Sequence, residues 1–379
     1  MLRKIKQSAW VFYRKFPAQI IYRFYLRRLK IPLLLILWLL LMCISAKVLY
    51  KSWEVVFFTK APSSSESLST NQPERRRSLL IYGADRSGTT FTTKMFAEDP
   101  QLMTVYEPLW IPIRWHNRGT WRRNVLDALK GILCCKFSGS EAGTRFLSHT
   151  LRQWYFADVK NPFVSPAFCV NKTCKDLSTD PIYADNVCLT KYKHSVTKVS
   201  ERRTPGNSMS SLLPTIFLEN PETDIRVIQL VRDPRGTLNS RIKLKWIGDY
   251  DDPKFRDTVK RVCSNLAKDI KFGRNLNKWQ DKYLEVHYKD LAGKPIETTK
   301  LMYRFAGFEM PESVLDWVVK NTLPSKDDLL KNQGARYSSV RNSTANVDKW
   351  LKESPIERIR IIEEECSETL DLLGLTKVT

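Results

Sequence analysis

The sequence predicts an α/β fold with a parallel central sheet flanked by helices. Strand-like apolar runs alternate along the chain with helical segments, which is typical of a sheet built with right-handed crossovers. Two of the strands run directly into polar, glycine-containing segments that begin a helix, at residues 83–91 and 232–240. Such junctions lie at the carboxyl end of a parallel sheet, where open α/β folds bind their ligands.

Each element of this fold has its own signal in the sequence. Short apolar runs predict strands at residues 79–82, 103–106, 226–231 and 283–288. The segments between and after them predict helices at residues 89–97, 234–244, 254–279, 295–306 and 355–373. Pro234 suits a first helical turn, where its missing N–H would be unpaired in any case. The last segment predicts a core-facing helix, because its apolar residues share one face: Ile359, Ile362, Cys366, Leu370 and Leu373.

The N-terminal region predicts a membrane anchor ahead of this fold. Residues 1–30 contain nine Lys and Arg residues and no acidic residue, and residues 31–46 carry no charge. A span needs about 20 residues, and a thin early-secretory membrane tolerates fewer, so we expect one transmembrane signal-anchor helix at residues 31–50. A buried helix and a cleaved signal peptide are the alternatives. The positive-inside rule places residues 1–30 in the cytosol and the C-terminus in the lumen, a type II orientation.

The segment behind the span offers little for a hydrophobic core. Residues 60–77 are rich in Ser, Pro and charged residues. They predict a stem over residues 51–77. One large folded domain is then expected over residues 78–379.

The first strand-to-helix junction has the glycine spacing of a phosphate-binding loop. Gly83 and Gly88 stand as in the pattern GxxxxGK[ST], in which backbone N–H groups and a helix N-terminus surround phosphates. Thr89 occupies the position of the usual lysine, and a cation appears inside the loop at Arg86 instead. The loop is therefore predicted to bind an anionic group without a magnesium–phosphate clamp.

The second junction offers another anion site. A buried strand over residues 227–231 is followed by Arg232, and Ser240 lies about two helical turns further on. Arginine supplies charge and a fork of donors, and serine supplies a hydroxyl, so the two side chains are predicted to converge on a second phosphate. Two such sites at strand-to-helix junctions suit a nucleotide that carries phosphates at two places.

These motifs resemble a known family, the membrane-bound carbohydrate sulfotransferases that use 3'-phosphoadenosine 5'-phosphosulfate (PAPS). The segment RSGTTF at residues 86–91 is similar to the family's 5'-phosphosulfate loop, and RDPRGTLNSR at residues 232–241 is similar to its 3'-phosphate segment. Three further stretches resemble the branch that sulfates galactose, N-acetylglucosamine and N-acetylgalactosamine at the 6-hydroxyl: residues 106–110, 288–291, and 337–343 with Lys349 and Trp350. The resemblance covers roughly residues 78 to 376.

The resemblance implies a P-loop-NTPase-like sulfotransferase fold and transfer of a sulfuryl group from PAPS to a hydroxyl of a glycan or glycosaminoglycan. It implies a Golgi membrane enzyme with a lumenal catalytic domain and no metal, and it leaves a homodimer open. The implied donor-binding residues are Asp85, Arg86, Ser87, Gly88, Thr89, Thr90, Phe91, Arg232, Asp233, Pro234, Arg235, Gly236, Thr237, Leu238, Asn239, Ser240 and Arg341.

Two residues are candidates for the chemistry itself. Arg86 is expected to stabilise charge on the sulfuryl and leaving oxygens, since positioning and charge stabilisation carry this kind of transfer. Glu107, just beyond the second strand, is the candidate general base for the acceptor hydroxyl. A structural carboxylate paired with an arginine is the alternative for Glu107, and His116 is the alternative base. Lys198 either approaches the donor or acceptor or is a solvated lysine.

The C-terminal motif offers further donor candidates. Arg341 and Ser343 either close over the donor or belong to a turn in a loop.

Net charge leaves several classes of partner open. The chain has 62 Lys and Arg residues against 40 acidic residues, a formal net charge of +22. Nucleic acid would explain this charge, but the chain has no recognisable nucleic-acid module, so we expect an anionic donor and a polyanionic glycan. An inactive glycan-binding homologue is disfavoured by the intact Arg86, Arg232 and Ser240. A P-loop enzyme that uses ATP or GTP is disfavoured by Thr89.

Cysteines and sequons agree with the secretory pathway. Seven of eight cysteines fall in the expected lumenal part, where disulfides persist, and they do not have the spacing of a zinc site. We expect one bridge between Cys263 and Cys366 and another within the set Cys169, Cys174 and Cys188. The sequons at Asn171 and Asn342 predict glycosylation at Asn171 and partial or no modification at Asn342, which lies in a segment expected to line the donor site.

Overall fold

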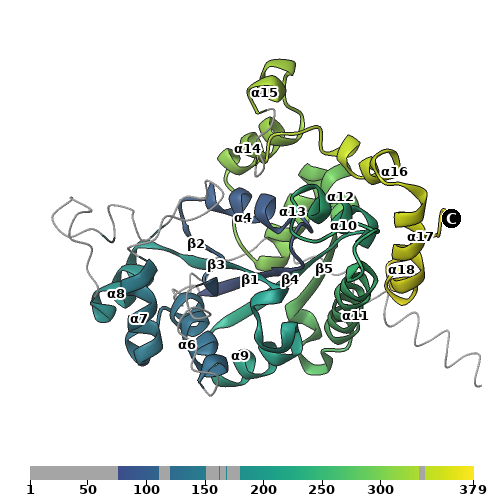
Figure 1. Ribbon diagram of the computed structural model, residues 1–379. Coiled ribbons are helices and arrows are strands. Elements are labelled where there is room, and N and C mark those ends of the chain that lie inside the picture. The colour runs from purple at the N-terminus through teal and green to yellow at the C-terminus, as the bar shows by residue number, and fades with distance from the viewer. Residues whose placement is uncertain (1–75, 111–119, 151–161, 163–167, 169–179, 333–337) are drawn as a thin grey trace, which may run out of the picture. The chain divides into compact units, whose positions relative to one another are not determined.

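The computed structural model describes residues 76–379 except 111–119, 151–161, 163–167, 169–179 and 333–337 (Figure 1). The expected cytosolic tail, the expected span over residues 31–50 and nearly all of the expected stem lie outside the described residues. Within residues 76–379 and apart from those gaps, no helix is both long enough and apolar enough to cross a membrane.

Five parallel strands form the sheet at the centre of the described part. They are β1 (Arg77–Gly83), β2 (Leu102–Tyr106), β3 (His194–Ser200), β4 (Asp224–Val231) and β5 (Tyr283–His287). Their spatial order is β2-β3-β1-β4-β5, and every pair is parallel. The predicted parallel α/β sheet is therefore confirmed, with β1 at its centre (Figure 1).

The sequence pattern missed one strand of this sheet. Strand β3 reads HSVTKVS, and all seven residues are buried although most are polar. It pairs with β1 on one side and β2 on the other. Because both neighbours bury it, its polar side chains find partners within the protein and leave no apolar run to recognise.

The helices lie on both faces of the sheet (Figure 1). The helices before β5 are α4 (Thr89–Ala97), α6 (Trp121–Cys134), α7 (Glu141–Thr150), α8 (Pro181–Lys191), α9 (Leu213–Glu219), α10 (Pro234–Lys243) and α11 (Phe255–Arg274). Those after β5 are α12 (Tyr288–Gly293), α13 (Pro295–Ala306), α14 (Glu312–Thr322), α15 (Lys326–Lys331), α16 (Lys349–Glu353), α17 (Ile356–Glu365) and α18 (Ser367–Leu372). Short 3-10 helices include Glu201–Arg203 and Asn277–Lys282.

Two predicted helices differ in extent from the observed ones. The helix expected over residues 254–279 ends at Arg274, and its last residues form the separate 3-10 helix Asn277–Lys282. The helix expected over residues 355–373 is two helices, α17 and α18, because Cys366 between them has non-helical backbone angles (φ −105°, ψ 13°).

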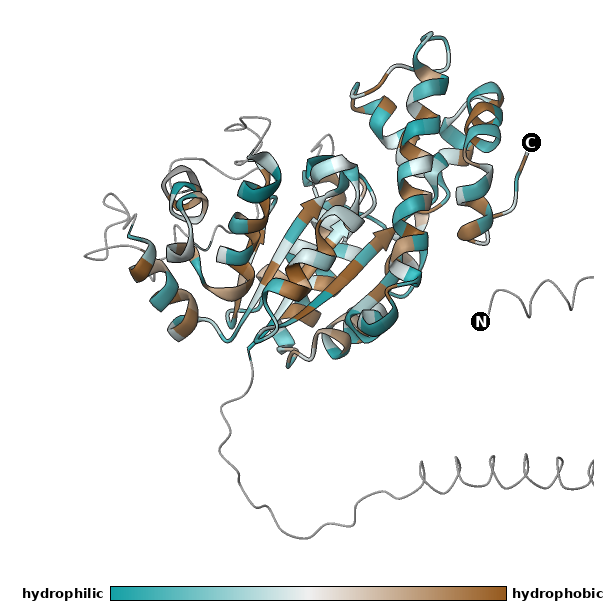
Figure 2. Ribbon diagram, turned by 90° about the horizontal axis from the view of Figure 1, so that it is seen from below, coloured by the Kyte–Doolittle hydropathy of each residue, from teal (hydrophilic) through white to brown (hydrophobic). Residues whose placement is uncertain are grey.

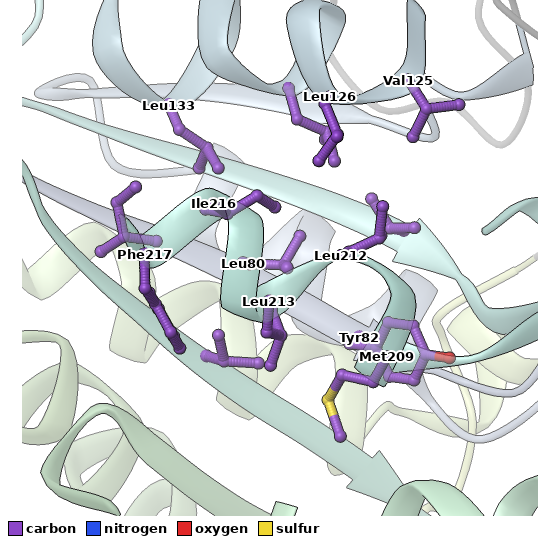
Figure 3. Packing of buried hydrophobic residues seen from close by; sticks show 14 of the residues in the cluster. Leu80, Tyr82, Val125, Leu126, Leu133, Met209, Leu212, Leu213, Ile216 and Phe217 are labelled. Atoms are coloured by element: carbon purple, nitrogen blue, oxygen red, sulfur yellow. The ribbon is translucent and has the colours of Figure 1, made fainter. Parts of the chain in front are cut away.

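Alternate residues of β1 enter different cores. Leu80 and Tyr82 pack with α6 and α9 on one face, through residues such as Leu133 and Phe217 (Figure 3). Leu79 and Ile81 pack on the other face, in a cluster that contains residues of α4, α13 and α14. This alternation is the two-residue period of a strand covered on both faces. Figure 2 shows the result, with hydrophobic strands between helices whose outer sides are hydrophilic.

Two disulfides join helices in the described part. Cys263 of α11 bonds to Cys366 with a Cα–Cα distance of 5.2 Å, which confirms that predicted bridge. Cys188 bonds to Cys135, with a Cα–Cα distance of 5.6 Å, so a bridge within the set Cys169, Cys174 and Cys188 could join only Cys169 to Cys174. The sequence spacing did not indicate the Cys135–Cys188 bridge, because the fold packs the end of α6, where Cys135 lies, against α8, which contains Cys188. Cys169, Cys174 and the sequon residue Asn171 lie outside the described residues.

Candidate functional site

The loop after β1 is shaped by its two glycines. Gly88 has φ 106° and is the residue before α4, a backbone region that favours glycine. A Cβ at Gly88 would lie 2.9 Å from Tyr288 Cδ2, and one at Gly83 would lie 2.8 Å from the carbonyl oxygen of Leu230. Both positions therefore lack room for a side chain, and the loop leads directly into the N-terminus of α4.

The two predicted phosphate motifs meet at Arg86. Its Nε donates a hydrogen bond to Ser240 Oγ at 3.0 Å, and Arg232 Nη1 donates to the Arg86 carbonyl at 2.9 Å. Arg241 adds two hydrogen bonds, from Nε and Nη2, to the Asp85 carbonyl at 3.2 and 3.0 Å. These contacts hold the loop after β1 against α10 and the residue Arg232 before it, which follow the neighbouring strand β4.

Asp85 fixes the loop from its other side. Its carboxylate accepts from Ser200 Oγ, at the end of β3, at 2.6 Å and pairs with Arg202 Nε, in the 3-10 helix that follows, at 2.5 Å. Burial opposes the charge, but Lys198, Arg202 and the serine hydroxyl together lower the pKa of Asp85. Asp85 is therefore an anchoring residue of the loop that remains ionised.

Two cavities open beside this junction. One, called here the loop cavity, is lined by Arg232 and by residues of the loop, α4, α12, α14 and the C-terminal loop of residues 338–343. The other, called the α10 cavity, is lined by residues of α10, α16 and the same C-terminal loop. Arg86, Arg232, Ser338 and Arg341 line both cavities. One elongated ligand can therefore contact these residues from both sides.

The polar groups at this junction fit an anionic ligand. Arg232 Nε and Ser87 Oγ are buried and have no hydrogen-bond partner among the described residues. Burial lowers the pKa of Arg232, and the neighbouring guanidinium of Arg341 lowers it further, although Tyr288 and Asp233 oppose this. A bound anion would satisfy the unpaired donor and offset the repulsion between the two cations.

The predicted donor residues divide by their place in the structure. Those that line at least one of the two cavities are Arg86, Gly88, Thr89, Thr90, Phe91, Arg232, Gly236, Asn239, Ser240 and Arg341. The others line neither: Asp85, Ser87, Asp233, Pro234, Arg235, Thr237 and Leu238. Within α10 the division follows the helical period, since residues 236, 239, 240 and 243 share the face toward the cavity.

The residues on the other sides of α10 have structural contacts. Asp233 caps the helix by accepting from the Arg235 N–H at 2.8 Å. The buried Arg235 guanidinium pairs with Asp233 at 2.8 Å and with Glu363 at 2.5 Å. Leu238 is fully buried in a cluster with Phe255 of α11. These side chains position α10.

Glu107 lies at the end of β2 in an unusual backbone conformation. Its φ is 51°, and the side chain is only 5% exposed. The two carboxylate oxygens accept from Lys198 Nζ and from Arg203 Nη1. A left-handed conformation at a non-glycine residue is costly and persists where surrounding contacts hold it. The pairing with Arg203 matches the structural alternative, and Glu107 lines neither cavity.

Contacts through Lys198 connect Glu107 to the loop. Lys198 is 2% exposed, so the solvated-lysine alternative is wrong. Burial opposes its charge, but Glu107, Tyr106 and Asp85 raise the pKa of Lys198. Its Nζ lies 5.2 Å from the ring centroid of Tyr106, whose hydroxyl is 3.1 Å from Thr90 Oγ1. Arg203 was not among the predicted site residues, because recognising its role requires strand β3.

The remaining predicted residues have varied positions. Ser343 lines the loop cavity and donates from Oγ to the Ala292 carbonyl at 2.7 Å. The sequon residue Asn342 is exposed next to it. His116 lies outside the described residues. Among the residues that are described, no group of three or more His, Cys, Asp or Glu side chains could hold a metal ion.

Comparisons with known proteins agree with the motifs. Carbohydrate sulfotransferase 3 of Mus musculus is 28% identical over 334 residues, which cover 79% of this chain and 68% of that protein. Carbohydrate sulfotransferase 1 of Danio rerio is 25% identical, covering 80% of this chain and 79% of that protein. The solved structure of mouse sulfotransferase SULT7A1 complexed with PAP has a TM-score of 0.40 and 10% identity, covering 78% of this chain and 84% of that one.

The resemblance inferred from the motifs is thus confirmed by curated relatives over most of the chain. A model of the sulfotransferase family matches residues 78–312, which is more than half of the 379 residues. The chain therefore belongs to the sulfotransferase family.

Proposed function

We propose that the protein transfers the sulfuryl group of PAPS to the 6-hydroxyl of galactose, N-acetylglucosamine or N-acetylgalactosamine in a glycan or glycosaminoglycan. One observation carries this function: Arg86, Arg232 and Ser240 converge where two cavities meet at the carboxyl end of a parallel sheet. Family membership and relatives named carbohydrate sulfotransferases support the reaction and the class of acceptor.

The two anion sites divide the donor between them. The loop of residues 85–90 and the N-terminus of α4 would hold the 5'-phosphosulfate, with the Arg86 guanidinium beside the sulfuryl oxygens. Arg232 and Ser240 would hold the 3'-phosphate, whose negative charge offsets the adjacent cations. The loop cavity, lined by Phe91 and Tyr288, would hold the adenosine between these ends.

Glu107 is the general base in this proposal. The acceptor oxygen forms a bond to sulfur while the bond from sulfur to the 5'-phosphate oxygen breaks, and the acceptor proton passes to the Glu107 carboxylate. Lys198 and Arg203 would orient that carboxylate through its two oxygens. Closure of a donor-bound site would have to bring the acceptor within reach of Glu107, because this residue lines neither cavity.

The proposed setting is the Golgi lumen, with residues 31–50 as a single type II membrane anchor. The cation-rich residues 1–30 and the uncharged residues 31–46 support this orientation. Mapping of glycosidase-sensitive sites in protein from secretory cells tests it. Modification at Asn171 is expected, and an unmodified Asn171 would contradict a lumenal C-terminal domain.

Transfer of radiolabelled sulfate from PAPS across a panel of acceptors tests the function. Keratan, chondroitin and N-acetylglucosamine-terminated acceptors are compared with the wild-type full chain and with Arg86→Ala. Labelling of at least one acceptor by the wild type, lost in Arg86→Ala, is expected. Binding of glycans without any transfer would instead identify an inactive glycan-binding homologue.

A further inference from the structure

Two unpaired N–H groups belong to side chains that line the α10 cavity. Arg232 Nε and Trp350 Nε1 are both buried without a hydrogen-bond partner among the described residues. A buried donor without a partner is costly, and such groups are rare in folded proteins. Arg232 is already assigned to a phosphate. Trp350, 4% exposed, has no role in the site described so far.

Both groups lie next to the same glycine of α10. A Cβ at Gly236 would lie 3.3 Å from Arg232 Nε and 3.2 Å from Trp350 Cδ1, the ring atom bonded to Nε1. The guanidinium and the indole thus flank one position that has no side chain. Arg232, Gly236 and Trp350 all line the α10 cavity, and a small group with several acceptor oxygens bound there beside Gly236 suits both unpaired donors.

The indole ring is held in place from two directions. The guanidinium carbon of Arg235 lies 4.3 Å from the ring centroid, and Arg235 is itself fixed by Asp233 and Glu363. Helix α16, which carries Trp350, is tied to α10 through Glu353. This carboxylate accepts from Lys243 Nζ at 2.7 Å and from Asn239 Nδ2 at 2.9 Å. The Trp350 N–H is therefore a preorganised donor.

We infer that the indole N–H of Trp350 binds the 3'-phosphate of the donor, together with Arg232 Nε across Gly236; this assignment rests on the proposed function. Arg232 and Arg341 supply charge, and Trp350 supplies a fixed neutral donor that selects for a phosphate at this position. The orphaned donors on both sides of Gly236 carry the inference, since no other described group uses them. Trp350 is accordingly a specificity residue for nucleotides that are phosphorylated at the 3' position.

Binding of two nucleotides that differ only at the 3' position distinguishes phosphate binding by Trp350 from a role in packing alone. Trp350→Phe keeps an aromatic ring beside Arg235 but removes the indole N–H together with part of the ring system. Calorimetric titration of the full chain would use 3'-phosphoadenosine 5'-phosphate (PAP) and 5'-AMP, which differ by the 3'-phosphate. Trp350→Phe is expected to raise the Kd for PAP about tenfold and to leave the Kd for 5'-AMP unchanged. Trp279→Phe, which alters an aromatic pair with Phe217 in another part of the fold, should change neither value.

A second variant covers the case in which Trp350→Phe does not fold. Gly236→Ala places a methyl group in close contact with both side chains, at a position inside α10 where the helix itself favours alanine over glycine. It should also weaken PAP and spare 5'-AMP. Unchanged PAP binding in either folded variant, or equal weakening of both nucleotides, would overturn the inference. A wild-type protein that binds PAP no more tightly than 5'-AMP would instead refute 3'-phosphate recognition, and with it the proposed function.

Discussion

Arg86 Nε donates a hydrogen bond to Ser240 Oγ at 3.0 Å, across 154 residues of sequence. The two residues belong to separate strand-to-helix junctions, and neighbouring strands β1 and β4 bring those junctions together, with Gly83 in register with Leu230. The contact joins the segment expected to bind a 5'-phosphosulfate to the segment expected to bind a 3'-phosphate. A single nucleotide can therefore bridge them.

Replacing Arg232 with alanine tests the 3'-phosphate site. Arg232→Ala removes a largely buried guanidinium and its hydrogen bond to the Arg86 carbonyl, so the Kd for PAP should rise about 10²-fold. Calorimetry measures this value. Arg256→Ala is the matched control, because Arg256 is an exposed arginine of α11 that pairs with Glu364 and Glu365. Equal affinity of Arg232→Ala and the wild type for PAP would refute the assignment.

Glu107→Gln tests the general base. Glutamine keeps the shape and much of the hydrogen bonding but cannot take the acceptor proton. PAP binding should therefore survive, while kcat for sulfate transfer falls about 10²-fold or more. Loss of both binding and turnover would mean a structural carboxylate, as the pairing with Arg203 also allows.

His116→Asn is the companion variant for the base. Turnover should stay within about a few-fold of the wild type, as expected for a residue outside the chemistry. A dead His116→Asn together with an active Glu107→Gln would show that histidine, and not Glu107, removes the proton.

Glu201 gives the fold a pH dependence. Burial raises the pKa of Glu201 to about 7 from 4.5, although Asn265 and Arg241 oppose the rise. The folded protein holds this proton more tightly than the unfolded chain. The stabilisation that comes from protonated Glu201 is therefore fully present below pH 4.5 and is lost as pH rises to about 7.

Glu201→Gln should remove this loss while its carbonyl still accepts from Asn265 Nδ2, at 2.8 Å in the wild type. Urea unfolding at pH 5 and pH 8 measures the effect. From pH 5 to pH 8, the free energy of unfolding of the variant should rise by roughly 2–3 kcal/mol relative to that of the wild type. If variant and wild type differed in their free energy of unfolding by the same amount at both pH values, the shifted pKa would be contradicted.

The Cys263–Cys366 disulfide should stabilise the C-terminal helices against α11. Replacing both cysteines with alanine should lower the free energy of unfolding by about 2–5 kcal/mol, since the bridge closes a loop of 103 residues. Thermal unfolding followed by circular dichroism measures the change. Cys134→Ala, which removes a buried free thiol, is the control and should cost less. A similar loss in both proteins would mean that packing, and not the bond, is responsible.

The sequence predicted the strands and helices that carry an apolar or capping pattern. Helices α4 and α13 have the expected bounds, and β1, β2, β4 and β5 lie where apolar runs occur. Strand β3 could not be found this way, because its polar residues are buried against distant partners. Ser200 binds Asp85, Lys198 binds Glu107, and Thr197 donates to the Val105 carbonyl at 3.1 Å.

The sequence predicted that whole segments bind the donor. In the structure, only some residues of each segment line the cavities, and in α10 these residues share one face. Helical periodicity in α10 could have separated Gly236, Asn239 and Ser240 from Leu238, since these positions recur at intervals of three and four residues. No pattern in the sequence around Trp350 could have indicated that it binds the donor. Its unpaired N–H is visible only once α16 lies beside α10.

The relative affinities for three nucleotides test the central claim most directly. The full-length wild type is titrated with PAP, with PAPS and with ATP, and each Kd is measured by calorimetry without added magnesium. Two converging anion sites without the P-loop lysine predict that PAP and PAPS each bind at least about tenfold more tightly than ATP. ATP binding as tight as or tighter than PAP would contradict the account, because one site built for a 3'-phosphate and a 5'-phosphosulfate should not prefer a triphosphate.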